Sequence, residues 1–356
     1  MIAMSLEAPV ASRPRIAPAR APRSGFLPER LLVIDPLTYR FGDYRIAELP
    51  RLLAHGDVLV LNDAATLPAA LRVDDELELR LVAADAEGSF RAMSFGAGSS
   101  RDPTEARGTP RPIEVGERLT FGGELSARVL DVDGRLLRVR FEQSGAAFWS
   151  ALYRAGEPIQ YAYAAWAFEL WDVQNRYAAR PWAMELPAAG RPLTFEALFE
   201  IERRGASVVS LTHAAGISST GSPALDALLP LPERYDIPAE TAAAVNRARG
   251  VGRVIAVGTS VVRAVEGSAD GAGALRARSG STDLRLTAAH EPKVVDGLLT
   301  GLHEPTTSHF ELLEAFAPGR LLERAFAHAA RSGYLQHEFG DSCLVLAGAL
   351  LERLEE

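Results

Sequence analysis

The first apolar runs of the chain are short and rich in β-branched residues, a pattern typical of buried strands. "RLLVID" ends at Asp35, and "DVLVLND" covers residues 57–63. Between them, "IAELPRLLAHG" (46–56) has the apolar spacing of a short helix. This order of strand, helix and strand predicts the start of a mixed α/β body.

Between about residues 68 and 143 the pattern changes to alternating apolar and polar positions without helix signals. The alternating runs are "ELELRLVA", "SFRAMSF", "ERLTF", "ELSARVLDV" and "RLLRVRFE". Asp133 and Gly134 separate the last two runs, and Asp-Gly is a strong hairpin signal. The Gly-, Pro- and Ser-rich segment 96–112 predicts a long loop. We therefore expect an inserted antiparallel β domain, a barrel or a sandwich, at 68–143.

After this segment the α/β pattern resumes. "LTFEALFEIERRG" predicts a helix with Thr194 as its cap and Gly205 as its stop. "ASVVSLTH" predicts a strand, "IPAETAAAVNRARG" a second helix, and "RVIAVGTSVVRAVEG" a buried strand, a tight turn and a helix. The expected fold class is a discontinuous mixed α/β body at 26–67 and 144–356, built as a distorted barrel or a large mixed sheet, with the β domain inserted.

Composition narrows the class of protein. The chain has 356 residues, 47% of them hydrophobic, which is enough apolar material for a large core. The net charge of −8 gives no global basic footprint, so any contact with nucleic acid must come from a local patch. The single cysteine, Cys343, excludes an internal disulfide and a Cys-rich zinc site, and we expect a buried thiol.

The N-terminal residues 1–25 alternate Pro, Ala and Arg and lack the apolar core of a secretory signal. They predict a disordered basic arm, and its arginines either contact phosphates or are simply solvated. These arginines are Arg13, Arg15, Arg20 and Arg23. No run in the chain approaches the ~20 apolar residues of a membrane helix, so we expect no membrane partner.

The segment "GLLTGLHEPTTSHF" (297–310) superficially resembles a zinc-protease motif. That motif needs two histidines four residues apart on one helix face, whereas His303 and His309 are six apart with Pro305 between them. The spacing therefore predicts a polar loop and no metal site.

The turn after "RVIAV" has the most chemical content. It delivers Gly258, Thr259 and Ser260 to the start of a helix, where free backbone N–H groups and hydroxyls can hold an anion. Arg263 follows one turn later. The same turn is also common for purely structural reasons. It fits neither the Walker loop nor the dinucleotide-binding pattern.

Three further polar segments are candidates. Asn62 and Asp63 follow a buried strand, where ligands tend to bind, although both can simply cap a turn. "SLTHAAGISSTG" carries His213 in a glycine-containing loop. "HEFGDSC" (337–343) places Asp341 beside the expected start of the last helix, which it would cap. No nucleophile–base pair can be assigned from spacing.

Taken together, these segments resemble the S-adenosylmethionine:tRNA ribosyltransferase-isomerase family of queuosine biosynthesis, in content and in order. The matching pieces are "RLLVID", "DVLVLND" with "TLPA", "PAAG" (187–190), "RVIAVGTSVVR", "GSTDL" (280–284), "VVDGLLTGLHEP" (294–305), "LLEAF" (312–316) and "FGDSCLVL" (339–346). They span nearly the whole chain from residue 31 onward.

The resemblance implies a cytoplasmic enzyme that moves the ribosyl part of S-adenosylmethionine onto 7-aminomethyl-7-deazaguanine at the tRNA wobble position. The products are epoxyqueuosine, adenine and methionine. It implies S-adenosylmethionine as co-substrate, no bound cofactor, no metal, tRNA as partner, and a monomer. A sulfonium makes the adjacent ribose carbon acidic, so the site needs a base, hydrogen-bond partners for sugar hydroxyls, and an acid for the departing adenine.

By resemblance, His303, Asp296 and Asp341 take the catalytic roles. The substrate-binding set implied by the resemblance and the turns above is Asn62, Asp63, Gly190, Glu233, Gly258, Thr259, Ser260, Arg263 and Thr300. The chain also departs from the family pattern, most clearly at Ala65 and Ala70, which replace arginines. A second interpretation is therefore a diverged paralogue that binds S-adenosylmethionine or a nucleoside for another reaction, or as a non-catalytic module.

Overall fold

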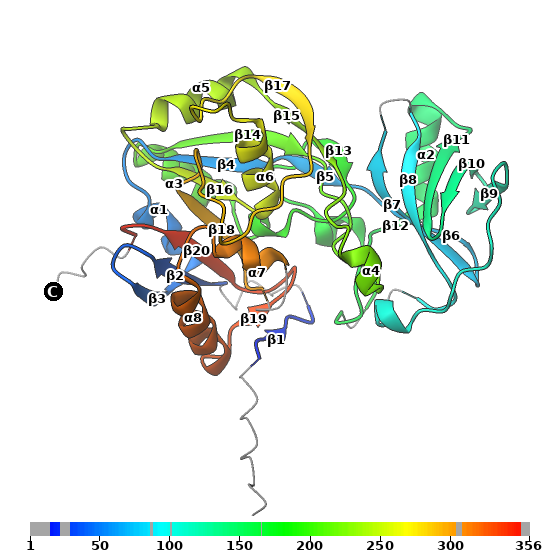
Figure 1. The fold of residues 1–356 in the computed structure, drawn as a ribbon, viewed down its shortest axis with the longest axis horizontal. Helices are drawn as coiled ribbons and strands as arrows, with labels where there is room; N and C mark the ends of the chain where they lie inside the picture. The colour runs from blue at the N-terminus through cyan, green and yellow to red at the C-terminus, as the bar shows by residue number, and fades with distance from the viewer. Residues whose placement is uncertain are drawn as a thin grey trace, which may run out of the picture.

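The computed structural model describes residues 15–21, 29–85, 88–99, 102–164, 166–303 and 308–349. It has two units that lie side by side, a body around a nine-stranded sheet and a unit around a seven-stranded sheet (Figure 1). The chain leaves the body after residue 62 and returns to it after the smaller sheet.

The large sheet is mixed, and its strand order shows several crossovers. The order is β17 (Arg278–Thr282), β15 (Glu233–Ile237), β14 (Ser207–His213), β4 (Val58–Asn62), β16 (Val254–Val257), β18 (Gly297–Gly301), β20 (Ser342–Leu346), β2 (Arg30–Asp35) and β3 (Arg40–Arg45). Strands β14, β4, β16 and β18 are parallel neighbours, whereas β15 and β20 pair with this group antiparallel.

Helices cover both faces of the large sheet, which explains why its central strands are continuously apolar. Val58 and Val60 of β4 pack in the core beneath α5 (Ala239–Ala248), α6 (Thr259–Ser268) and α8 (Gly319–Arg331). The alternate residues Leu59 and Leu61 pack toward α1 (Leu49–Leu52) and α3 (Phe195–Arg203). The remaining helices are η1 (Ile46–Glu48), η2 (Thr104–Ala106), η3 (Leu170–Val173), η4 (Ala188–Gly190), α2 (Gly145–Ala155), α4 (Pro223–Asp226) and α7 (Ser308–Leu313).

The second unit is a curled antiparallel sheet with its own apolar core. Its strand order is β12 (Gly156–Glu157), β6 (Ala70–Asp74), β7 (Leu77–Ala84), β8 (Phe90–Phe95), β11 (Leu136–Phe141), β10 (Leu125–Asp133) and β9 (Arg118–Phe121). The predicted hairpin at Asp133 and Gly134 is confirmed, because Asp133 pairs with Leu136 across it. Sheet pairing extends this unit beyond residue 143, since β12 pairs with β6 and α2 buries Phe148 and Leu152 in its core.

Two small parallel sheets complete the fold. One joins β5 (Ala64–Thr66) to β13 (Arg180–Ala183), and the other joins β1 (Ala17–Pro18) to β19 (Leu335–Gln336). The second sheet corrects the prediction of a disordered arm for residues 15–21, because Ile16 and Ala19 are buried and the Ala19 amide donates to Gln336. Arg13 and Arg23 lie outside the described residues.

The predicted fold class, a mixed α/β body with an inserted antiparallel β unit, is confirmed. The buried thiol of Cys343 is confirmed too, and burial raises its pKa above the ordinary value. The expected last helix after Asp341 is wrong. Residues 342–346 form strand β20, paired on one side with β2 and on the other with β18. In the part of the chain that the structure describes, none of the helices has the length and apolar character to cross a membrane.

Candidate active site

Four parallel strands of the large sheet end at one edge, from which the chain also departs for the second unit. Strands β14, β4, β16 and β18 lie next to one another in register. Each ends at or just before a polar residue or a glycine, respectively His213, Asn62, Gly258 and Gly301, and Thr300 directly precedes the last of these. Ligands of open α/β sheets bind at this carboxyl edge, so it is the candidate site.

The amide of Asn62 holds the neighbouring elements of this edge together. Its Nδ2 donates to the His213 carbonyl at 3.0 Å and to Ser260 Oγ at 3.3 Å. Its Oδ1 accepts from the amides of His213 at 2.9 Å and Ala64 at 3.1 Å. The side chain is buried and fully used, so Asn62 fixes β14 and α6 relative to β4.

Asp63 performs a similar task on the outer side of β14. Its carboxylate accepts from the hydroxyls of Thr212 at 2.5 Å and Ser210 at 3.0 Å. Burial, and next the negative charge of nearby Asp63, raise the pKa of the Tyr177 hydroxyl well above its ordinary value. Tyr177 is therefore a neutral hydrogen-bond donor at this edge.

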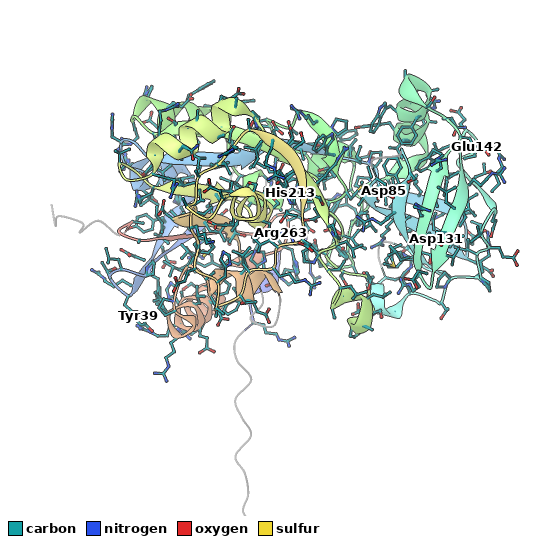
Figure 2. All side chains as sticks on the ribbon, turned by 45° about the horizontal axis from the view of Figure 1, so that its top comes forward. Tyr39, Asp85, Asp131, Glu142, His213 and Arg263 are labelled. Carbon is teal, nitrogen blue, oxygen red and sulfur yellow. The ribbon has the colours of Figure 1, made fainter. Side chains whose placement is uncertain are left out.

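A buried acid–base cluster lies beside Asn62. Glu233 accepts from the Gly216 amide at 2.6 Å and from Arg263 Nη2 at 2.5 Å, and His213 Nε2 lies 3.5 Å from its Oε2. Burial raises the pKa of Glu233, and Arg263 offsets this shift only in part. Burial, and next the positive charge of Arg263, lower the pKa of His213 well below its ordinary value, so His213 is neutral. Figure 2 shows His213 and Arg263 close together on the side of the body toward the second unit.

Several buried polar atoms around this edge have no hydrogen-bond partner among the described residues. They are His213 Nδ1 and Nε2, Arg263 Nε, Tyr177 Oη and Asn175 Oδ1. Buried polar groups in folded proteins are nearly always satisfied, so a group of orphaned atoms needs an explanation. Their position at the carboxyl edge indicates surfaces that receive a polar ligand.

Two glycines allow the backbone to approach this cluster closely. Gly258 precedes α6 with φ 94°, a conformation that favours glycine, and its amide donates to Leu299 at 2.8 Å. A Cβ at Gly190 would lie 1.8 Å from Tyr177 Oη, so only glycine fits there without displacing the tyrosine. A Cβ at Gly258 would lie 3.4 Å from Ala189, which places the η4 turn against the start of α6. The structure thus brings Gly190, Gly258, Thr259 and Ser260 to one place.

Residues 14–345 match the sequence model of a family described as "Queuosine biosynthesis protein". The chain belongs to this family. It is 32% identical over 333 residues to the S-adenosylmethionine:tRNA ribosyltransferase-isomerase of Parvibaculum lavamentivorans, covering 89% of this chain and 91% of the relative. It is 33% identical over 341 residues to the enzyme of the same name from Methylocella silvestris, covering 90% and 91%.

A solved structure, the S-adenosylmethionine tRNA ribosyltransferase of Thermotoga maritima, has the same fold. It aligns with a TM-score of 0.50 at 23% identity and covers 92% of this chain and 96% of that one. The fold of this queuosine-family chain is therefore shared with a solved relative over nearly its whole length.

The described part of the segment "TGLHEP", residues 300–303, lies at the same edge of the sheet. Thr300 is buried near the end of β18, and its Oγ1 lies 2.9 Å from His303 Nε2. Residues 304–307 and the side chain of His309 lie outside the described residues, so Glu304 and His309 are not placed. Among the side chains that are described, no group of three or more His, Cys, Asp or Glu is arranged to hold a metal ion.

Asp296 is not part of this group, which corrects its predicted place beside Thr300 and His303. It precedes β18 and accepts from the Val254 amide at 2.8 Å, at the amino end of the parallel strands. Thr300, which contacts the His303 ring, is four residues further along the extended chain, and at ~3.3 Å per residue this places it roughly 13 Å from Asp296. Burial raises the pKa of Asp296, and nearby Asp57 and Glu266 raise it further, but its hydrogen bond serves the strand start.

Asp341 lies at the carboxyl edge of β18, but its carboxylate has a structural task. Oδ1 accepts from the Arg30 amide and Oδ2 from the Leu335 amide, both at 2.8 Å. These bonds join β2 to β19 across the start of β20. Asp341 is 2% exposed, and it caps no helix.

Sequence reasoning missed Tyr177 and Asn175, and it gave no role to Glu338. Burial raises the pKa of Glu338 to about 7, and its Oε2 is a buried atom without a hydrogen bond in the described chain. Its carbonyl accepts from Arg191 Nε at 2.8 Å, which ties it to the turn that contains Gly190. No periodicity marks these residues, because they lie in loops.

Ala65 and Ala70, where the family resemblance led us to expect arginines, lie near the junction of the two units. Ala65 pairs with Pro181 in the small β5–β13 sheet. Ala70 pairs with Arg80 across β6 and β7, and both line a cavity of about 290 Å³. Arg80 is 2% exposed, so a buried guanidinium remains at this junction although residue 70 is alanine.

Proposed function

We propose that this chain transfers and isomerises the ribosyl group of S-adenosylmethionine onto 7-aminomethyl-7-deazaguanine at the tRNA wobble position. The products are epoxyqueuosine, adenine and methionine. S-adenosylmethionine is a co-substrate and no cofactor is permanently bound. The proposal places the reaction in the cytoplasm, with the chain acting as a monomer.

One feature of the structure supports this proposal for the residues of this chain. Orphaned polar atoms of buried side chains gather at the carboxyl edge of the sheet, next to the closely approaching turns of Gly190 and Gly258. A substrate with a sulfonium, an amino acid part and a sugar presents many polar groups. A rigid edge with several unsatisfied donors and acceptors suits such a molecule better than an apolar pocket would.

The proposed roles follow from what each group can donate or accept. The first backbone amides of α6, after Gly258, and the hydroxyl of Ser260 hold a carboxylate or another polar part. Arg263 Nε and Tyr177 Oη donate to sugar hydroxyls. Glu233 holds Arg263 in place through its ion pair.

Proton transfer is assigned to His303 and Glu338. His303, with Thr300 on its Nε2, is the proposed base, because imidazole can take up a proton near neutral pH. Glu338, with a pKa of about 7, is able to donate a proton at neutral pH, as departing adenine requires. Asn62 and Asp63 keep the strand ends in register around these groups.

The test is incubation with S-adenosylmethionine labelled in the ribose and with tRNA that carries the precursor base, followed by nucleoside analysis. We expect label in a new hypermodified nucleoside, and none with control tRNA that has guanine at the wobble position. Binding to tRNA should fall steeply as salt rises. Binding of S-adenosylmethionine without any labelled nucleoside would instead support the diverged paralogue.

A further inference from the structure

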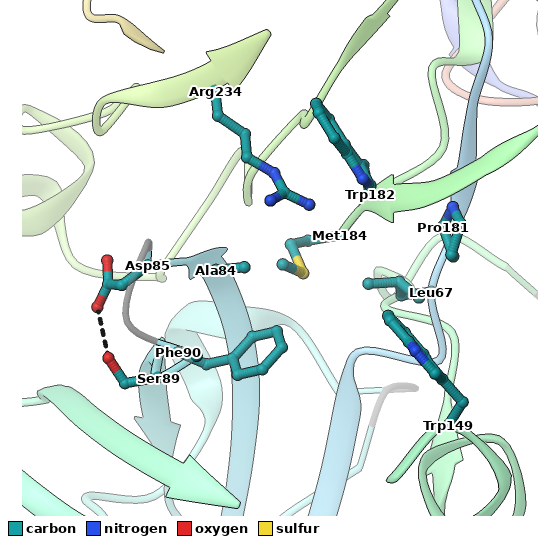
Figure 3. A pocket seen from close by; sticks show the side chains of 11 residues that line it. Leu67, Ala84, Asp85, Ser89, Phe90, Trp149, Pro181, Trp182, Met184 and Arg234 are labelled. Atoms are coloured by element: carbon teal, nitrogen blue, oxygen red, sulfur yellow. Dashed lines mark hydrogen bonds between the residues drawn. The ribbon is translucent and has the colours of Figure 1, made fainter. Parts of the chain in front are cut away.

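A second cavity lies where the two units meet, outside the acid–base cluster. Its volume is about 240 Å³. The second unit contributes Asp85 and Ser89, beside the facing ends of β7 and β8, and Trp149 of α2. The body contributes Trp182 of β13, Met184 directly after it, and Arg234 of β15 (Figure 3). The cavity therefore has an indole on each side and a guanidinium at one wall.

The guanidinium of Arg234 is held by stacking alone. Its Cζ lies 3.7 Å from the centre of the Trp182 ring. Among the described residues it has no hydrogen bond and no ion pair. Asp85, at the same cavity, is engaged with Arg91 at 3.5 Å and with the Ser89 hydroxyl at 3.3 Å. Arginine remains protonated at neutral pH, so several charged donors of Arg234 are free for a ligand.

The cavity is separate from the candidate active site, although the two are neighbours. Along β15, Glu233 and Tyr235 are buried, whereas Arg234 between them points to the other face of the strand. Glu233 contacts Arg263, and Arg234 contacts Trp182. A ligand in the cavity would thus lie across a single strand from the acid–base cluster.

We propose that this cavity receives one unstacked nucleobase of the RNA substrate. The inference rests on the proposed function, because it takes tRNA as the partner. Unstacked RNA bases bind between aromatic rings and on arginine planes. The volume is below the ~300–1,000 Å³ of sites for drug-sized ligands, so it suits a single planar ring system. The free guanidinium favours a base with two acceptors on one edge, as guanine has.

The test compares the equilibrium binding of a labelled tRNA transcript to wild-type protein, Trp182→Ala, Arg234→Gln and a control, Trp171→Ala. Trp171 is 74% exposed and lines neither cavity, so its loss should leave binding unchanged. Trp182→Ala should raise the Kd for RNA about 5- to 150-fold, the range for losing one base–aromatic stack. Trp182→Phe should recover part of this loss, which separates stacking from misfolding.

Two further measurements, binding of S-adenosylmethionine and formation of the labelled nucleoside, distinguish failure of the base pocket from failure of the proposed function. Calorimetric binding of S-adenosylmethionine should be unchanged in Trp182→Ala. If wild-type protein makes the labelled nucleoside but Trp182→Ala binds RNA normally, the base pocket is wrong and the proposed function stands. If wild-type protein makes no product, yet Trp182→Ala weakens RNA binding, the function is wrong and the pocket stands.

The salt dependence identifies the group that Arg234 contacts. With a base in the cavity, Arg234→Gln should weaken binding at all salt concentrations, with an unchanged slope. A slope reduced by about 0.7 without any effect of Trp182→Ala would mean a phosphate contact and would overturn the base pocket.

Discussion

Replacing Glu233 by Gln tests whether the acid–base cluster is a coupled unit. Glu233 is 5% exposed and pairs with Arg263 at 2.5 Å. The substitution keeps the shape but leaves the positive charge of Arg263 buried without its partner. Removing one partner of a buried pair typically costs ~3–5 kcal/mol, because the remaining charge is uncompensated. Against a total stability of ~5–15 kcal/mol, that loss is large.

The matched variants are Arg263→Met and the double variant that carries both changes. Removing both charges leaves no uncompensated ion. The free energy of unfolding of the double variant should therefore fall by clearly less than the sum of the decreases in the two single variants. Urea unfolding with linear extrapolation measures each free energy. In Arg263→Met the pKa of His213 should also rise, since Arg263 now lowers it, which the histidine ring signals in NMR titration would report.

The functional half of this prediction is that the double variant remains folded but does not turn over S-adenosylmethionine. Additive stability losses would refute the coupling between Glu233 and Arg263. Normal activity in the stable double variant would show that the pair only supports the fold, and would remove Arg263 from the proposed site.

Three other predictions follow from single positions. Burial raises the pKa of Glu338 from 4.5 to about 7, so the folded state binds the proton more tightly and stability should fall by up to ~3 kcal/mol as pH rises from 4.5 to 7. In Glu338→Gln that loss should vanish from melting curves taken across this range, and an unchanged pH slope would exclude Glu338 as its source. Gly190→Ala places a Cβ 1.8 Å from Tyr177 Oη and should lower both the Tm and the affinity for substrate. Adding Tyr177→Phe removes the hydroxyl and should restore part of both. A Tm equal to that of wild-type protein in Gly190→Ala would mean that the turn can shift to make room. His303→Gln should cut turnover ~10²–10⁴-fold while calorimetry still detects S-adenosylmethionine binding, and full activity would take His303 out of the mechanism.

The sequence by itself determined the local elements. The apolar runs became β2 and β4, Thr194 caps α3 by accepting from Ala197, and the Asp133–Gly134 turn closes the β10–β11 hairpin. Each depends on neighbouring residues only, through periodicity, a cap or a required backbone angle. The order of the family segments likewise predicted the fold, because order needs no tertiary information.

Tertiary structure alone decided what the strand ends bring together. Asn62 and His213 are 151 positions apart, and only the parallel pairing of β4 and β14 joins them. The apolar run after Asp341 was expected to be helical, since a short run does not distinguish a buried helix from a strand, and pairing with β2 and β18 made it β20. Asp296 is seven positions from His303, yet an extended strand holds them at opposite edges. The stack of Trp182 on Arg234 depends on where β13 and β15 lie in the folded body, and no local pattern encodes a contact between two strands so distant along the chain.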